Sequence, residues 1–451
     1  MAGARSQHTL DEDEKSHQSS PEGIASSINL EKAEANDGVD ANTPLSSSWR
    51  EEPLSPRESS KVASIIRACS SNDFSTLCSL AGTEQGFVED AIRRQAWPIL
   101  LGSTSTPVPD DSWQSLPPHR DEHQVSLDVD RAFVYYPSHD TPAQLSSRRA
   151  ALTTLIVSVL RTHPSLNYFQ GYHDIAQVLL LVLGLPSARS ALARLSLLRI
   201  RDFMLPSIAG TRSHLDLIPA ILYASDPPLT AHLAGLQNFF ALSATLTMFA
   251  HDVESYGGIA RLFDYLLARD AVAGVYMFAA LVTLRRDELF DIPADEPEML
   301  YAVLSKLPKP LDLEALVRRA EGLRESHPPE KLPRRAWKGV SRSSVLKTTI
   351  PLESLREQTL VQGEKWLDIR AREIESEEVR KAALRRMRKT VLTYRRPASA
   401  VLVAVLVGVV SVWLGRYGGI TSANSIAGVA RDVQRRVVYS VARALGWHTG
   451  L

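Results

Sequence analysis

The chain has 451 residues, which is enough for one large domain or for two ordinary domains with tails. Its 51 basic and 51 acidic residues give a formal net charge of zero, so it lacks the basic bias that a nucleic-acid-binding protein usually shows. Only two cysteines are present, and no histidine stands at zinc-ligand spacing from them, so we expect ordinary thiols of a reducing compartment and no metal site.

Residues 1–58 form a polar N-terminal tail. They are rich in Ser, Glu, Asp, Asn and Pro, and Trp49 is their one aromatic residue. Such a segment cannot bury enough apolar surface to offset the entropy lost on ordering, so we predict that it is disordered. Its first 30 residues contain several acids and no apolar run, which excludes a signal peptide and indicates a mainly cytosolic chain. Ser20-Pro21 and Ser55-Pro56 are either phosphorylation sites or unmodified parts of this tail.

Residues 60–325 show the pattern of a helical domain. Apolar residues recur at spacings of three and four, and clusters of Gly, Pro, Ser and Asp separate the apolar segments. Strand-like alternation is almost absent, so the pattern predicts one all-α domain. The sequence has none of the GxxxxGK[ST], HExxH or GxSxG motifs of common enzyme classes.

Two short polar motifs stand in the first half of this domain. Arg93 and Trp97 are four residues apart, so a helix would place them on one face, and we expect an architectural pair with the guanidinium over the ring. Asp128 and Arg131 are three residues apart and would meet on a helix or turn. Such a pair, taken alone, is equally well explained as a surface ion pair.

A third motif is the polar and aromatic octet 167–174. The apolar spacing predicts a helix over 149–160 before it and a buried helix over 175–183 after it. The octet is therefore a short junction between two packed helices, where Gln170 and Gly171 are available to meet a partner. The alternative is a turn that only satisfies its own backbone.

The three motifs, taken in order, resemble those of the TBC domain of Rab GTPase-activating proteins. They read Arg93-x-x-x-Trp97, Val125-x-x-Asp128-x-x-Arg131 and Tyr168-x-Gln170-Gly171-Tyr172, and the resemblance covers residues 60–325. It extends to the branch of the family that carries a C-terminal membrane anchor. The resemblance implies a multi-helix TBC domain and a regulator of GTPases that is not itself an enzyme.

The resemblance also implies roles for these residues. The family supplies an arginine finger and a glutamine finger to the nucleotide site of a GTP-bound Rab, and here these would be Arg131 and Gln170. The other motif residues would support them. Asp128 would orient Arg131 or hold the backbone at its turn. Tyr168 and Gly171 would shape the glutamine loop, with Tyr172 as part of the same motif, and Arg93 and Trp97 would brace the scaffold. The protein would need no cofactor of its own, because GTP and Mg²⁺ arrive with the Rab. The anchored branch implies Rabs of transport from the endoplasmic reticulum to the Golgi.

The C-terminal quarter carries a membrane signal. We expect a charged linker and helix over 326–396, and then residues 397–415, which are apolar and uncharged and would span ~29 Å as a helix. Cations on the N-terminal side would keep the domain in the cytosol, with one span in the endoplasmic reticulum or an early secretory membrane. A buried core helix is the alternative. Residues 416–451 are predicted to form a basic amphipathic segment, either on a membrane surface or exposed to solvent.

Two other functions compete with the activator. One is a catalytically weak Rab-binding scaffold on a membrane, and the other is a membrane-anchored interaction protein with an unrelated helical domain. The presence of both Arg131 and Gln170 favours the activator, because a scaffold has no need of either. Ala132 departs from the family pattern, since many members have a small hydroxyl residue after the arginine, and Asp130 adds an acid before it.

Overall fold

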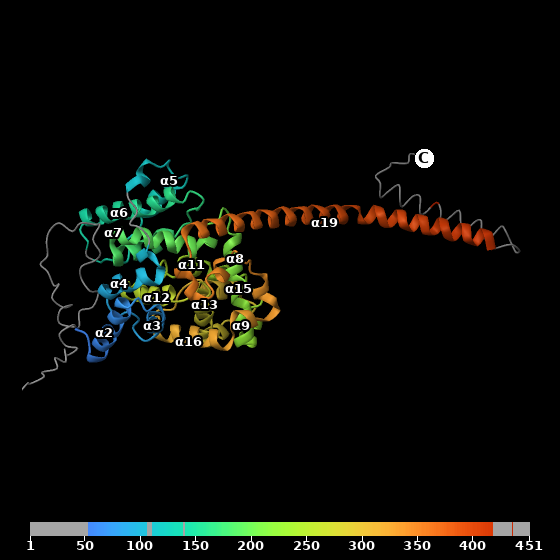
Figure 1. Ribbon diagram of the computed structural model, residues 1–451. Helices are drawn as coiled ribbons and strands as arrows, with labels where there is room; N and C mark the ends of the chain where they lie inside the picture. Colours follow the sequence, from blue (N-terminus) through green and yellow to red (C-terminus); the bar gives the residue numbers. More distant parts are fainter. Residues whose placement is uncertain (1–52, 106–110, 139, 418–434, 436–451) are drawn as a thin grey trace, which may run out of the picture. The chain divides into compact units, whose positions relative to one another are not determined.

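A computed structural model describes residues 53–105, 111–138, 140–417 and 435. The chain divides into two compact units, residues 1–371 and 372–451. The regular elements of the described residues are all helices, so the all-α prediction is confirmed (Figure 1). Most of the predicted disordered tail, residues 1–52, lies outside the described residues. Pro56 already opens a helix, and Ser55 caps it through the backbone N–H of Glu58.

The helices of the first unit follow one another through short connections. In chain order they are α2 (Pro56–Ser70), α3 (Phe74–Gly82), α4 (Asp90–Leu101), α5 (Glu122–Val129), α6 (Pro142–Thr162), α7 (Tyr172–Leu198), α8 (Ala209–Leu215), α9 (Ile218–Ser225), α10 (Pro227–His232), α11 (Leu242–Leu246), α12 (Tyr256–Leu267), α13 (Ala273–Leu284), α14 (Arg286–Phe290), α15 (Pro297–Leu304), α16 (Leu313–Ser326), α17 (Ala336–Gly339) and α18 (Val345–Thr348). Short 3₁₀ turns lie between them: η1 (Ser103–Ser105), η2 (Asp111–Ser115), η3 (Arg201–Phe203), η4 (Asn238–Ala241), η5 (Pro329–Lys331), η6 (Pro333–Arg335) and η7 (Leu352–Arg356). The last helix, α19 (Leu360–Tyr417), begins in the first unit and continues into the second.

The core of the first unit is built around α7 and α13. Nearly every residue of α13 is buried, and α13 packs against α16, α9 and α11. Helix α7 packs along α6 and against α4 (Figure 1). The helices predicted over 149–160 and 175–183 fall inside α6 and α7, so both predictions are confirmed. Gly184 interrupts α7 with φ 71° and ψ 161°, and the chain resumes a helical path at once, so the element runs further than the predicted end.

The segment expected to be a linker begins with packed structure. Val345 and Leu346 are fully buried, and Val340 and Leu355 are nearly so. The guanidinium of Arg201, in η3, donates to the backbone oxygen of Ser343 at 2.6 Å. The helical unit therefore continues past residue 325, where the sequence pattern placed its end, to residue 371. The buried apolar residues of this segment are few and stand among many charged residues. Apolar spacing therefore did not reveal them.

Helix α19 passes through the predicted membrane span as continuous helical backbone. The side chains of residues 397–404 and 412–417 lie outside the described part of the structure, as do nearly all of residues 418–451. Among the described residues, one helix is long and apolar enough to cross a membrane, and it is α7, with 83% of the relevant window buried inside the domain. Helix α7 is thus a core helix, and the span over 397–415 stays a prediction.

Candidate functional site

A groove of about 540 Å³ opens where the chain after α5 meets the start of α7. Arg131 and Gln170 both line it, and both side chains are exposed. Leu242 and Leu246 of α11, and His251 after that helix, also line the groove. The fold therefore brings the arginine of the second motif and the glutamine of the third to one depression in the surface.

The guanidinium of Arg131 is hydrogen-bonded along one edge, and the side chain is otherwise largely exposed to solvent. Its Nη2 donates to Oδ1 of Asp128 at 2.6 Å, and its Nε donates to the backbone oxygen of Leu127 at 3.3 Å. The side chain of Arg131 is 66% exposed, whereas that of Asp128 is fully buried. The simple surface ion pair that the spacing allowed is therefore wrong, because the acid is a buried anchor for an exposed cation.

Asp128 also connects the two motifs that flank the groove. The hydroxyl of Tyr168 donates to its Oδ2 at 2.9 Å, and Nε2 of Gln124 donates to its Oδ1 at 3.1 Å. Burial, together with the negative charge of Asp128, raises the pKa of Tyr168 well above its usual value, so the hydroxyl stays a donor. One buried carboxylate therefore fixes both the loop that carries Arg131 and the loop that carries Gln170.

Gly171 shapes the loop that carries Gln170. Any other residue at this position would force its neighbours to shift. Gly171 caps α7 at φ 101°, and a Cβ built there would lie 2.5 Å from Cγ2 of Thr247. On its far side Tyr172 is fully buried, with its hydroxyl 2.6 Å from Oγ of Ser196. Gln170 is thus left at an exposed turn between a pinned glycine and the fixed ring of Tyr168.

Two histidines that sequence reasoning missed complete the groove. Nδ1 of His251 lies 2.9 Å from Oδ2 of Asp174, and Nε2 of His173 lies 3.3 Å from Oδ1 of the same carboxylate. Burial lowers the pKa of His173, whereas the hydrogen bond with Asp174 raises the pKa of His251. His173 and Asp174 stood beside the motif, but nothing in the sequence pointed to His251, 77 residues away from Asp174.

Comparison with known proteins shows where this architecture occurs. Residues 90–290 match the family model of the Rab-GTPase-TBC domain. TBC1 domain family member 20 of Bos taurus is 34% identical over 281 residues, which cover 61% of this chain and 70% of that protein. Its Homo sapiens counterpart is 32% identical over 302 residues, 65% of this chain and 75% of that protein. GTPase-activating protein gyp10 of Schizosaccharomyces pombe is 34% identical over 261 residues, 55% of this chain and 67% of that protein.

The chain belongs to the TBC family of Rab GTPase-activating proteins. The resemblance inferred from the three motifs is confirmed at the level of the family. A member of this family is a GTPase activator and not itself an enzyme, and a Rab GTPase is the partner that the domain implies.

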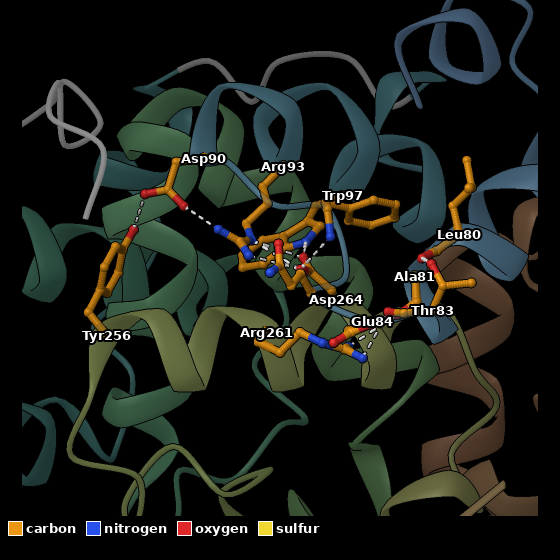
Figure 2. A network of polar contacts seen from close by, with 12 residues as sticks. Leu80, Ala81, Thr83, Glu84, Asp90, Arg93, Trp97, Tyr256, Arg261 and Asp264 are labelled. Atoms are coloured by element: carbon orange, nitrogen blue, oxygen red, sulfur yellow. Dashed lines mark hydrogen bonds and ion pairs between the residues drawn. The ribbon is translucent and has the colours of Figure 1, made fainter. Parts of the chain in front are cut away.

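The first motif of this TBC domain lies in the core, away from the groove. Arg93 and Trp97 are fully buried, and both donate to Asp264 of α12: Nε of Arg93 to Oδ1 at 3.0 Å, and Nε1 of Trp97 to Oδ1 at 2.8 Å (Figure 2). Nη1 of Arg93 also donates to Asp90 at 2.8 Å. The sequence predicted that the guanidinium of Arg93 stacks on the ring of Trp97. Instead, both side chains bond to the carboxylate of Asp264. This geometry gives the motif an architectural role, tying α4 to α12.

Arg93 keeps its charge despite complete burial. Burial alone would lower the pKa of Arg93, but the charges of Asp264 and Asp90 outweigh it and raise that pKa. Tyr256 extends the network by donating its hydroxyl to Oδ2 of Asp90 at 2.7 Å (Figure 2).

Gln177, which the sequence did not reveal, fixes the loop that follows α5 and carries Arg131, called the arginine loop below. The backbone N–H of Phe133 donates to Oε1 of Gln177 at 2.9 Å, in a buried position. Phe133 has φ 64°, a left-handed conformation that is uncommon for a bulky residue. Gln177 lies on α7, so this bond joins the arginine loop directly to the helix that follows Gln170.

Proposed function

We propose that this protein stimulates GTP hydrolysis by a Rab GTPase through Arg131 and Gln170, supplied together in trans. The observation that carries the proposal is that both side chains are exposed on one groove while their loops share the buried carboxylate of Asp128. Two exposed side chains on a fixed base can reach into a partner without losing their alignment.

The proposed role of Arg131 follows from the charge that develops during hydrolysis. Negative charge builds on the phosphoryl oxygens in the transition state, and a guanidinium supplied by a partner stabilises it, which contributes about 10³–10⁵ in rate. The bond to Asp128 holds one nitrogen of Arg131 and leaves the exposed remainder free to bind oxygen. Asp128 thus acts by positioning the arginine.

The proposed role of Gln170 is to orient the attacking water. Its carboxamide can accept a hydrogen bond from the water and donate one at the same time, which favours in-line attack on the phosphorus. GTP and Mg²⁺ belong to the Rab, so the activator contributes side chains only. The loop between Tyr168 and Gly171 keeps the amide at the groove.

We also propose that the substrates are Rabs of transport from the endoplasmic reticulum to the Golgi, and that the chain is anchored in an early secretory membrane by residues 397–415. The support comes from the resemblance to the anchored branch and from the uncharged segment itself. Within that segment Val405, Leu406, Val409 and Val410 are each at least half exposed in their own unit, as lipid-facing side chains would be.

The anchor is tested by expressing the full chain in cells and extracting the membranes with alkaline carbonate. We expect the wild type to stay in the membrane pellet, and we expect a Leu406→Arg/Val410→Arg variant to be released, because two charges near the bilayer centre oppose insertion. A variant with two arginines in the exposed part of the charged segment, Val379→Arg/Leu384→Arg, is the matched control. Release of the wild type would contradict the proposed span.

The activity is tested by single-turnover GTP hydrolysis with a panel of GTP-loaded Rabs and the full chain in detergent. The full chain is used because residues beyond 330 pack into the domain. We expect at least one early secretory Rab to be accelerated by about 10³-fold or more, and we expect Arg131→Ala and Gln170→Ala each to remove nearly all of the acceleration. Arg212→Ala is the matched control, since Arg212 is 67% exposed and lies outside the groove.

Three results would count against the fingers. Either no Rab responds, or the variants at Arg131 and Gln170 leave the acceleration intact, or Arg212→Ala lowers it as much as they do. GTP-dependent Rab binding without acceleration would instead identify a Rab-binding scaffold.

A further inference from the structure

Two adjacent apolar side chains project from the arginine loop into solvent. Val134 is 75% exposed and Tyr135 is 50% exposed, and both line the groove that contains Arg131. Their neighbours on either side point inward, with Phe133 7% exposed and Tyr136 4% exposed. The loop therefore displays an apolar pair between two buried aromatic residues.

The pair is held on a fixed base and is not the tip of a loose loop. Phe133 is bonded to Gln177 of α7, and the ring of Tyr136 packs on that of Tyr256 with centroids 5.7 Å apart. A single exposed apolar side chain on a protein surface needs no explanation. Two in succession, fixed outward beside a partner-binding groove, indicate a surface that is covered when the partner binds.

Further apolar side chains belong to the same groove, among polar ones. Leu242 and Leu246 also line it, and Leu127, whose backbone oxygen accepts from Arg131, is 46% exposed. The surface that presents the guanidinium of Arg131 therefore combines apolar and polar groups. Interfaces commonly place such contacts around a few charged groups, where they exclude water and strengthen the central interactions.

We propose that Val134 and Tyr135 form the apolar docking contact for the GTPase, seating an apolar surface beside its nucleotide pocket, an inference that rests on the proposed function. The backbone from Arg131 to Tyr135 spans at most about 14 Å. A standard interface buries about 800 Å² on each partner, a patch with a radius of about 16 Å. A GTPase whose contact is centred on Arg131 therefore also covers Tyr135. The apolar pair supplies affinity, and the two finger residues supply chemistry.

The test is steady-state hydrolysis of a responsive GTP-loaded Rab by the full chain, with Val134→Ser and Tyr135→Ser as the variants. Each substitution removes apolar area from the contact, so KM is expected to rise about tenfold while kcat stays within about twofold of the wild type. Tyr135→Phe keeps the apolar area and is expected to behave as the wild type. Ile208→Ser is the matched control, because Ile208 is 56% exposed and lies outside the groove.

The result that overturns the inference is an unchanged KM in both serine variants. A fall in kcat at unchanged KM also overturns it, because the pair would then position Arg131 and not dock the partner. If the wild type accelerates no Rab, the proposed function fails by itself. Equilibrium binding of the full chain to Rabs loaded with a non-hydrolysable GTP analogue then decides the docking inference: about tenfold weaker binding by Val134→Ser supports it, and unaltered or absent binding overturns it.

Discussion

Arg93 and Arg131 lie in the same domain, and each donates to an aspartate that is fully buried. Around Arg93 the cation is buried as well, with Asp264 and Asp90 on two of its edges. Around Arg131 the cation is 66% exposed and only its inner edge is bonded. The same pair of residue types therefore gives an internal brace where both partners are enclosed, and an outward-facing charge on a fixed base where one is not.

The strongest test of this difference between Arg93 and Arg131 is Asp264→Asn. This change leaves the guanidinium of Arg93 and the indole of Trp97 facing a neutral group in the core, and it is expected to destabilise the fold by about 3–5 kcal/mol. Urea denaturation of the full chain in detergent, followed by circular dichroism, measures the change. Arg131→Ala is the control and should cost only about 1 kcal/mol, because water replaces the exposed guanidinium while Tyr168 and Gln124 still donate to Asp128. Equal losses in the two variants would remove the distinction between brace and finger.

A smaller effect is expected from Asp128→Asn. The charge that accepts from Arg131 and Tyr168 is lost while the shape is kept, so stability should fall by about 2–3 kcal/mol. Because the arginine loses its orientation, kcat for the stimulated GTP hydrolysis by the Rab should also fall about ten- to a hundredfold. Asp216→Asn, at a 60% exposed aspartate outside the groove, should change neither quantity. A stability loss with full kcat would mean that Asp128 does not position Arg131.

Two tyrosines provide a matched pair at the edges of the two networks. Tyr256 donates to Asp90, and Tyr168 donates to Asp128. Each change to phenylalanine removes a hydrogen bond to a buried carboxylate and should cost about 1–2 kcal/mol of stability. Tyr168→Phe also removes the contact of the hydroxyl with Nδ1 of His173 at 3.1 Å, so its loss should be the larger of the two. Only Tyr168→Phe is expected to lower kcat as well, because its bond joins the finger loops. Denaturation and hydrolysis assays on both variants decide this, and an equal effect on kcat would contradict it.

The smallest expected effect is a pH dependence centred on His173. Burial lowers its pKa from the usual 6.5, so the unfolded chain binds a proton at this site more readily than the folded chain. The contribution of His173 to stability is therefore complete above pH 6.5 and is lost as the pH falls toward its lowered pKa. Urea midpoints measured from pH 7.5 to 5.5 should decline more steeply for the wild type than for His173→Gln. Parallel curves would show that folding does not lower the pKa of His173.

The sequence predicted the helices around the groove because their apolar spacing is a local signal. It predicted Gln170 and Arg131 as a set only through the order of three motifs. It could not predict the acceptor that Arg93 and Trp97 share, since Asp264 is 171 residues from Arg93 and has no distinctive neighbours. His251 could not be predicted for the same reason, because it is distant in sequence from its partner Asp174.

Local conformation set a second limit. Nothing in the composition of the arginine loop indicates that Phe133 adopts a positive φ, because glycine or asparagine is the usual signal for it. The bond to Gln177 that supports this conformation crosses between two elements and becomes visible only in three dimensions. The exposure of Val134 and Tyr135 follows this conformation along the chain. It could therefore not be predicted from the sequence either.

The first turns of α19 join the domain in a way that matters for mechanical load. Glu364 lies 2.7 Å from Nδ1 of His163, and the guanidinium of Arg201 lies over the ring of Trp366 at 5.0 Å. Gly363 is pressed so closely on α7 that an added Cβ would lie 2.8 Å from Cβ of Leu197. A force applied to these first turns would therefore be shared between the C-terminal ends of α6 and α7. The start of α19 is fixed in this way to the two helices whose junction carries Gln170, through the near end of α6 and the far end of α7.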